Sequence, residues 1–156
     1  MAGGKPALTP PEAGPREAFA PYTLRLLREG HGIGVHHDHH FSLKIYEALR
    51  ADADDSRVLS FITPLSLPIA GGELIVYGLT LDNPDKPALP NGRWDHLAIE
   101  RRFDCAVLTP AVGDLVIFAS GRCLHRVAPV VGDRPRVTLG GFLALVRYRD
   151  RVLYWS

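Results

Sequence analysis

The sequence predicts an all-β protein with one or two short helices, arranged as a jelly roll. Three observations support this fold class. About eight short segments are rich in β-branched residues or alternate between apolar and polar residues, Gly and Pro punctuate the chain between them, and only one segment has helical spacing. With 156 residues, the chain is long enough for one hydrophobic core.

The first half of the chain begins with a segment that lacks large apolar side chains. Residues 1–21 contain five prolines, so we expect a flexible arm there and a folded domain over residues 22–156. An alternating strand is predicted over Tyr22–Arg28, followed by an extended piece over Ile33–His40 and a short helix over Phe41–Arg50. Val58–Leu67 and Glu73–Tyr77 are predicted to form a hairpin around Gly71 and Gly72.

Residues 78–101 contain several turn signals and no clear periodicity, which predicts a long loop that acts as a lid. Trp94 in this loop and Trp155 near the C-terminus are candidates for the wall of a substrate site. The rest of the chain reads as successive strands, predicted over Phe103–Thr109, Asp114–Ala119, Cys123–Val127, Arg136–Val146 and Arg151–Trp155.

Charge and composition exclude several classes of function. The 18 Lys and Arg residues are scattered among 17 Asp and Glu residues, so we expect neither nucleic acid nor a membrane surface as a partner. No apolar run approaches the length of about 20 residues that crosses a bilayer, and no secretory signal is visible. Two cysteines cannot build a disulfide framework. We therefore expect a soluble, cytoplasmic protein.

The stretch GHGIGVHHDHH, residues 30–40, is the first candidate for chemistry. Side chains two apart on a strand share a face, so His36 and Asp38 can point at the same spot. The third ligand of a metal site would come from His125, which lies in a strand, rather than from His96 in the predicted loop. Two histidines and one carboxylate leave three positions open, as in non-haem Fe(II) oxygenases, although zinc could bind the same ligands.

A second group of residues suggests a site for a dicarboxylate. Arg134 follows His125 by nine residues, and Thr138 follows Arg134 by four. A cosubstrate that chelates the metal at one end would need a bidentate donor and a hydroxyl for its far carboxylate. Arg136 shares a strand face with Arg134, and either could be the anchor. We favour Arg134, because Pro135 fixes the backbone beside it.

Taken together, these motifs resemble the 2-oxoglutarate/Fe(II)-dependent dioxygenases of the prolyl-hydroxylase-like kind. The resemblance covers Tyr22 to Phe142, and the matching pieces are His36-x-Asp38, GGEL at residues 71–74, GDLVIF at residues 113–118, and the segment from His125 to Arg134. It implies a double-stranded β-helix, with iron held by His36, Asp38 and His125. It also implies that Arg134 with Thr138, or Arg136, anchors 2-oxoglutarate.

The resemblance further implies the reaction. With O2, 2-oxoglutarate would be decarboxylated to succinate and CO2 while a C–H bond of a small-molecule or amino-acid-like substrate is hydroxylated. Radical halogenases of this superfamily replace the carboxylate ligand by a small residue, and the presence of Asp38 therefore favours hydroxylation.

Two other functions and one assembly stay open at this stage. A cupin-type metal enzyme, either an isomerase or a cosubstrate-free dioxygenase, would use His37 and His39, but the expected glutamate is missing at Leu43 and Lys44. A non-catalytic jelly-roll binding module would carry its histidines incidentally. A homodimer also remains open, since the chain has little N-terminal helical support for its outer sheet.

Overall fold

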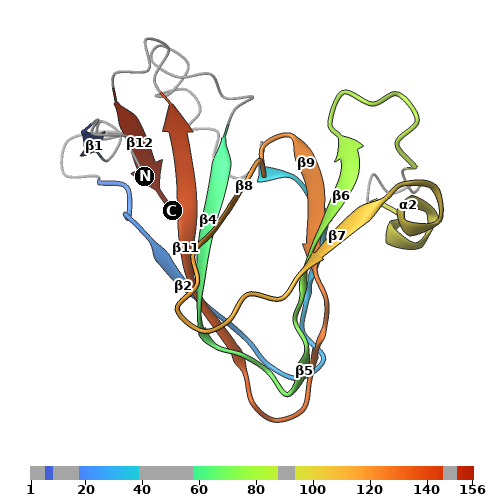
Figure 1. The fold of residues 1–156 in the computed structure, drawn as a ribbon, viewed down its shortest axis with the longest axis horizontal. Helices are drawn as coiled ribbons and strands as arrows, with labels where there is room; N and C mark the ends of the chain where they lie inside the picture. The colour runs from blue at the N-terminus through green and yellow to red at the C-terminus, as the bar shows by residue number, and fades with distance from the viewer. Residues whose placement is uncertain (1–5, 9–17, 39–57, 88–93, 146–150) are drawn as a thin grey trace.

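Two β-sheets face each other and form a jelly roll, which confirms the predicted fold class (Figure 1). The computed structural model describes residues 6–8, 18–38, 58–87, 94–145 and 151–156. The predicted helix over Phe41–Arg50 lies outside these ranges. Within them, no helix combines the length and the apolar character that a bilayer crossing requires.

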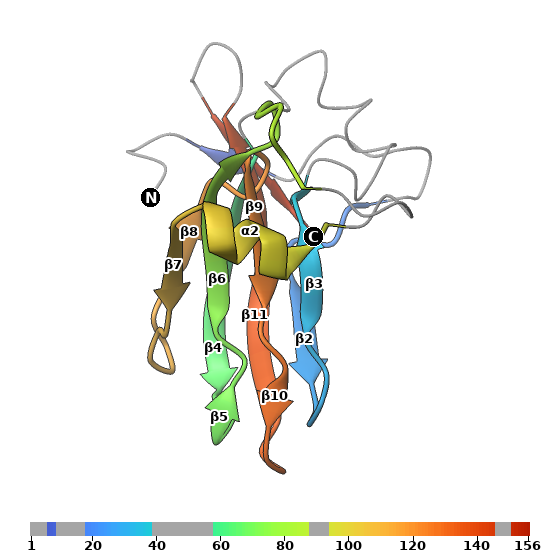
Figure 2. The same cartoon turned by 90° about the vertical axis from the view of Figure 1, so that its right-hand side faces the viewer.

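Among the described residues, the large sheet has six strands and the small sheet has four. The large sheet contains β1 (Ala7–Leu8), β2 (Thr23–Leu27), β4 (Leu59–Ser66), β8 (Val116–Phe118), β11 (Arg136–Leu145) and β12 (Val152–Trp155). The small sheet contains β3 (Ile33–His36), β6 (Leu74–Thr80), β7 (Cys105–Leu108) and β9 (Cys123–Val127). A separate pair, β5 (Ala70–Gly71) and β10 (Val130–Val131), lies at the lower end of the molecule in Figure 2.

Strand β11 organises the large sheet because it has neighbours along both of its edges. It pairs with β4 on one side, and on the other side it pairs first with β2 and then with β12, all antiparallel. Thr138 lies opposite Arg25 of β2, and Phe142 lies opposite Trp155 of β12. Side chains of these paired residues share one face, which is turned toward the small sheet and lines a cavity.

The hairpin predicted around Gly71 and Gly72 is wrong. Strand β4 belongs to the large sheet and β6 to the small sheet, and the chain crosses from one to the other through β5. Gly71 and Gly72 have φ values of 70° and 73°. A Cβ at Gly71 would lie 2.1 Å from the carbonyl oxygen of Pro129. The glycines are therefore needed for a close crossing between sheets rather than for a tight turn between paired strands.

The predicted loop over residues 78–101 is also wrong in part, because its last residues form helix α2 (His96–Arg102). Asp95 caps this helix by accepting a hydrogen bond from the backbone N–H of Ala98 at 3.1 Å. Ile99 is fully buried. The helix has only two turns and one buried residue, so it shows little helical periodicity in the sequence. The Pro and Asn-Gly turn signals before it therefore led to the prediction of a loop.

Helix α2 packs on the face of the small sheet that points away from the cavity (Figure 2). There it covers a cluster, here called the outer cluster, of Ile75, Tyr77, Leu79, Ile99 and Leu124. The residues that alternate with these in β6 and β9, among them Leu74 and His125, line the cavity instead. Trp94 packs against the outer cluster, so it does not form the predicted substrate wall. Trp94 and α2, which form the last part of the predicted lid, thus lie on the outer face of the sheet.

A polar contact fastens α2 to this sheet. Arg126 of β9 forms an ion pair with Glu100 at 2.8 Å, and the Tyr77 hydroxyl donates a hydrogen bond to the same carboxylate at 2.9 Å. Burial, and then the hydrogen bond with Glu100, raises the pKa of Tyr77 to about 12. These three residues stabilise the outer face and take no part in the cavity.

Candidate metal centre

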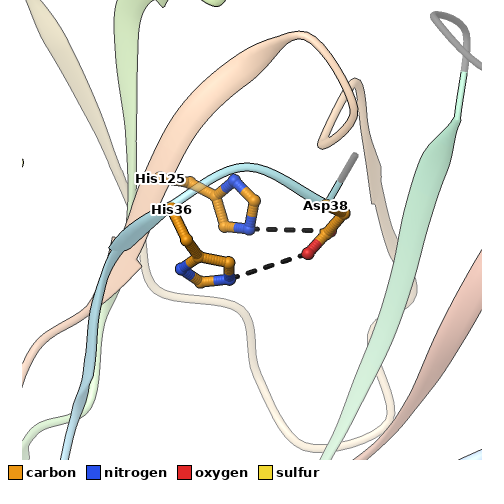
Figure 3. Close-up of side chains that lie close together, drawn as sticks. All are labelled: His36, Asp38 and His125. Atoms are coloured by element: carbon orange, nitrogen blue, oxygen red, sulfur yellow. Dashed lines mark ion pairs between the residues drawn. The ribbon is translucent and has the colours of Figure 1, made fainter. Parts of the chain in front are cut away.

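His36, Asp38 and His125 lie together at the inner face of the small sheet (Figure 3). Strands β3 and β9 are antiparallel neighbours, and their register places His36 directly opposite His125. Asp38 follows His36 by two residues and returns to the same face. One ligand atom from each residue lies within 4.8 Å of the others. The structure thus brings together the three residues predicted as metal ligands.

The hydrogen bonds of the two imidazoles define which nitrogen of each ring is available. His36 Nδ1 lies 2.7 Å from the carbonyl oxygen of Gly34, and His125 Nδ1 lies 3.0 Å from that of Cys123. A carbonyl oxygen can only accept, so each Nδ1 carries the proton and each Nε2 presents a lone pair. This arrangement is typical of metal-binding histidines.

Both Nε2 atoms face the carboxylate of Asp38. The distance from His36 Nε2 to Oδ1 is 3.6 Å, and that from His125 Nε2 to Oδ2 is also 3.6 Å, which is too long for a hydrogen bond. Lone pairs of three acceptors therefore converge on one point. Nitrogen and oxygen donors bind first-row divalent cations at about 2.0–2.2 Å, and the donor set suits Fe(II) or zinc.

The protonation state of His125 agrees with this donor set. Burial, and then the nearby His36, lowers the pKa of His125 to about 4, against the opposing effect of Asp38. The His125 side chain is therefore neutral at physiological pH. A neutral imidazole can bind a metal without first losing a proton.

Two serines orient the carboxylate of Asp38, and the sequence pattern did not reveal them. Ser60 of β4 donates a hydrogen bond to Asp38 Oδ2 at 2.5 Å, and the hydroxyl oxygens of Ser60 and Ser120 lie 2.7 Å apart. Because the single proton of Ser60 is used on Asp38, Ser120 must donate to Ser60. The backbone N–H of Asp38 also donates to the carbonyl oxygen of Ser120 at 3.0 Å.

The other histidines of the sequence do not join this cluster in the described part of the chain. His37 is buried but does not line the cavity, and His96 is exposed on α2. His39 and His40 lie outside the described residues, so the alternative pair of His37 and His39 is not examined by the structure.

The cluster opens into a cavity of about 720 Å³ between the two sheets. This volume is within the usual range for small-molecule sites. Phe61, Phe118, Phe142 and Trp155 supply aromatic walls, and Trp155 also packs in a buried core cluster with Val58. Phe118 contacts the ring of His125 edge-on, with ring centroids 4.9 Å apart. Besides the metal cluster, the charged side chains that line the cavity in the described part of the chain are two arginines, Arg25 and Arg136.

Arg136, and not the favoured Arg134, reaches the cavity. Arg136 is 5% exposed and its Nη1 donates to the Thr138 hydroxyl at 3.3 Å. Arg134 is exposed and its Nη2 donates to the carbonyl oxygen of Pro68 at 3.2 Å, outside the cavity. Strand β11 begins only at Arg136, so the alternation that would place both arginines on one face does not extend past Pro135. The geometry therefore favours Arg136 over Arg134 as the candidate anchor.

The surroundings of Arg136 fit a bound carboxylate. Among the described residues, no Asp or Glu forms an ion pair with it, and burial, followed by the positive charge of Arg25, lowers the pKa of Arg136. A buried guanidinium without an acidic partner is costly, so an anionic ligand beside it is strongly favoured. Thr138, which is 4% exposed, provides the hydroxyl expected next to such an anchor.

The GGEL motif supports the arginine sterically. A Cβ at Gly72 would lie 3.0 Å from the Cδ atom of Arg136 and 3.0 Å from Cγ of Pro68. Gly72 therefore leaves the space that the aliphatic part of Arg136 occupies. The motif is visible in the sequence, but its contact with Arg136 is visible only in the fold.

The chain matches one family of known proteins. The whole chain, residues 1–156, matches the model of the family described as carrier-protein-independent halogenase WelO5. This match confirms the resemblance to the Fe(II)- and 2-oxoglutarate-dependent enzymes that the motifs indicated. A comparison with curated protein sequences gives no match.

Several solved structures resemble the chain. The N-substituted L-amino acid dioxygenase from Burkholderia ambifaria AMMD is 18% identical, with a TM-score of 0.60 over 89% of this chain and 54% of that one. Its complex with alpha-KG is also 18% identical, with a TM-score of 0.62 over 96% of this chain and 58% of that one. The chain thus shares their fold and spans 54–58% of their length.

Proposed function

This chain belongs to the family of the halogenase WelO5, and we propose that it is an Fe(II)/2-oxoglutarate-dependent dioxygenase that hydroxylates a C–H bond. The substrate would be a small molecule or an amino-acid-like compound. The observation that carries the proposal is the cluster of His36, Asp38 and His125, in which three acceptors converge at the wall of a cavity. The family membership supports Fe(II) and 2-oxoglutarate as the cofactors.

In this proposal each cavity residue has a defined role. His36, Asp38 and His125 hold Fe(II), and Ser60 fixes the carboxylate of Asp38. When bound, Fe(II) and 2-oxoglutarate supply the oxidation of a C–H bond by O2, with succinate and CO2 as coproducts. The aromatic side chains around the cluster exclude water from the reacting groups.

Arg136 and Thr138 are proposed to anchor the far carboxylate of 2-oxoglutarate. Both side chains are buried in the cavity wall, and the guanidinium is already oriented by its hydrogen bond to Thr138. A guanidinium can bind a carboxylate through two parallel hydrogen bonds, which fixes the direction of a dicarboxylate.

Halogenation is the second candidate, because the family model bears the name of a halogenase. The carboxylate of Asp38 argues for hydroxylation instead. It faces the two imidazoles and is held there by Ser60. With Fe(II) bound by the three residues, this carboxylate would occupy the place that a halide would need.

The test uses protein reconstituted with Fe(II) without oxygen and then given 2-oxoglutarate and air. We expect wild type to form succinate even without a substrate, and Asp38→Ala and His125→Ala to lose most of this turnover. His96→Ala is the matched control, because His96 is exposed on α2 and distant from the cavity lining. Absence of succinate in wild type would contradict the proposal.

The same assay separates the alternatives. Metal-dependent product without consumption of 2-oxoglutarate would favour a cupin-type enzyme, and absence of metal binding would favour a binding module. Once a substrate is known, product mass in buffers containing chloride or bromide distinguishes the two oxygenase reactions. Addition of one oxygen atom is expected, and halogen in the product would establish halogenation.

A further inference from the structure

We propose that Arg25 binds a carboxylate of the substrate, so that the cavity selects small molecules that carry one negative charge. This inference rests on the proposed function and specifies its substrate class. Arg25 belongs to β2, and neither a motif nor the resemblance pointed to it.

The position of Arg25 is set by strand pairing. Strand β2 runs along β11, and Arg25 lies opposite Thr138 in the register. Thr23, Arg25 and Leu27 all line the cavity, while Leu24 and Leu26 point outward and are exposed. The guanidinium therefore enters the same cavity as Arg136 from the neighbouring strand.

Arg25 has no acidic partner in the part of the chain that the structure describes. The only carboxylate that lines the cavity there belongs to Asp38, which faces the two histidines. A cation that faces a cavity without a counter-ion favours an anionic ligand over a neutral one of the same shape.

The charges of the cavity indicate how many negative groups it accepts. With Fe(II) bound, its two positive charges, the negative charge of Asp38 and the positive charge of Arg136 would leave two positive charges. The two carboxylates of 2-oxoglutarate neutralise these. Arg25 then contributes one further positive charge that no cosubstrate group offsets, and a substrate with a single carboxylate balances it.

The different burial of the two arginines indicates which one binds the substrate. Arg136 is 5% exposed and hydrogen-bonded to Thr138, as suits a cosubstrate that binds deep in the cavity. Arg25 is exposed, so its guanidinium remains hydrated until a ligand arrives. A hydrated cation at the more open side is suited to a ligand that enters after the cosubstrate.

The test measures binding directly with anaerobic protein that holds Fe(II) and 2-oxoglutarate. The probes are a panel of small carboxylic acids, each paired with its uncharged primary amide, and binding is followed by thermal shift and then calorimetry. Arg25→Gln removes the charge, and Arg25→Lys keeps it without the planar fork. Arg28→Gln is the matched control, since Arg28 follows β2 and does not line the cavity.

In wild type and Arg28→Gln, the carboxylates are expected to bind about tenfold or more tightly than their amides, as one charge-assisted contact implies. In Arg25→Gln this preference should fall below about threefold, with an intermediate value in Arg25→Lys. The affinity for 2-oxoglutarate should change by less than the affinity for the carboxylate probes.

Three outcomes would overturn the inference. The first is that wild type shows no preference for carboxylates, which includes the case in which no probe binds. The second is a preference that survives Arg25→Gln, and the third is that Arg25→Gln loses more affinity for 2-oxoglutarate than for the carboxylate probes. Succinate formation by wild type is measured in parallel. If it is present, such outcomes refute the role of Arg25 alone; if it is absent, the proposed function itself fails.

Discussion

Replacing Ser60 by alanine tests whether the carboxylate of Asp38 is held in place for a metal. The substitution deletes one hydroxyl from β4 and therefore removes the hydrogen bond of 2.5 Å to Asp38 Oδ2. Ser60 is 6% exposed and Asp38 is 5% exposed, so water has little access to replace the lost donor. The backbone N–H of Asp38 keeps its bond to Ser120.

The expected magnitude follows from the charge of the acceptor. A hydrogen bond to a charged group contributes about 1.5–3 kcal/mol, against about 0.5–1.5 kcal/mol between neutral groups. Removal of a group that orients a metal ligand lowers metal affinity by about 10- to 100-fold. Ser60→Ala is therefore expected to weaken metal binding within that range. Ser120→Ala, which removes a donor to a neutral hydroxyl, should weaken it by less than Ser60→Ala does.

The assay is a competition between the protein and a chelator of known affinity for Fe(II), performed without oxygen. Urea unfolding of the metal-free proteins is measured beside it, so that a general loss of stability is distinguished from a loss of metal affinity. Equal metal affinities of wild type and Ser60→Ala would refute the reasoning. An effect of Ser120→Ala as large as that of Ser60→Ala would also refute it, since the hydrogen bond to the Asp38 carboxylate would then not determine the metal affinity.

Three further substitutions test the cavity and the outer face. Arg136→Gln should lower 2-oxoglutarate affinity in calorimetry by about tenfold or more, whereas Arg134→Gln should leave it within about twofold. A larger loss in Arg134→Gln than in Arg136→Gln would indicate that Arg134 is the anchor. Gly72→Ala places a Cβ 3.0 Å from Arg136 Cδ at a φ of 73°, so we expect a loss of about 1–2 kcal/mol in urea unfolding together with weaker 2-oxoglutarate binding. Ile99→Ala should cost about 2–5 kcal/mol of stability without changing 2-oxoglutarate affinity; weaker binding there would indicate that α2 does act on the cavity.

The sequence was sufficient for features that depend on local periodicity. Strand parity placed His36 and Asp38 on one face, and the strand over Cys123–Val127 was predicted with the bounds that β9 has. His125 was chosen because it lies within that strand, and antiparallel pairing then placed it opposite His36. The sheet fold itself followed from the number of short strands and the turns between them.

Local periodicity does not show where a strand begins or which of its faces is covered. Arg134 and Arg136 have equal parity, and only the start of β11 separates them. The alternation of β2 was visible, but nothing in it tells that the face with Arg25 turns inward while Leu24 and Leu26 remain exposed. Ser60 is one polar residue in an otherwise ordinary strand, and its contact with Asp38 spans 22 residues of sequence.

The contact between Ser60 and Asp38 also links the two sheets mechanically. Both imidazoles belong to strands of the small sheet, whereas the carboxylate that faces them accepts a hydrogen bond from Ser60 in the large sheet. A cation held by His36, Asp38 and His125 would fix the Asp38 carboxylate to β3 and β9, and the hydrogen bond from Ser60 would then connect this fixed carboxylate to β4. Metal binding would also stabilise the folded state as a whole, so amide hydrogen exchange that requires global unfolding should slow in β4 as well as in β9. At a free metal concentration of 100 times Kd, the protection would amount to about 2.7 kcal/mol.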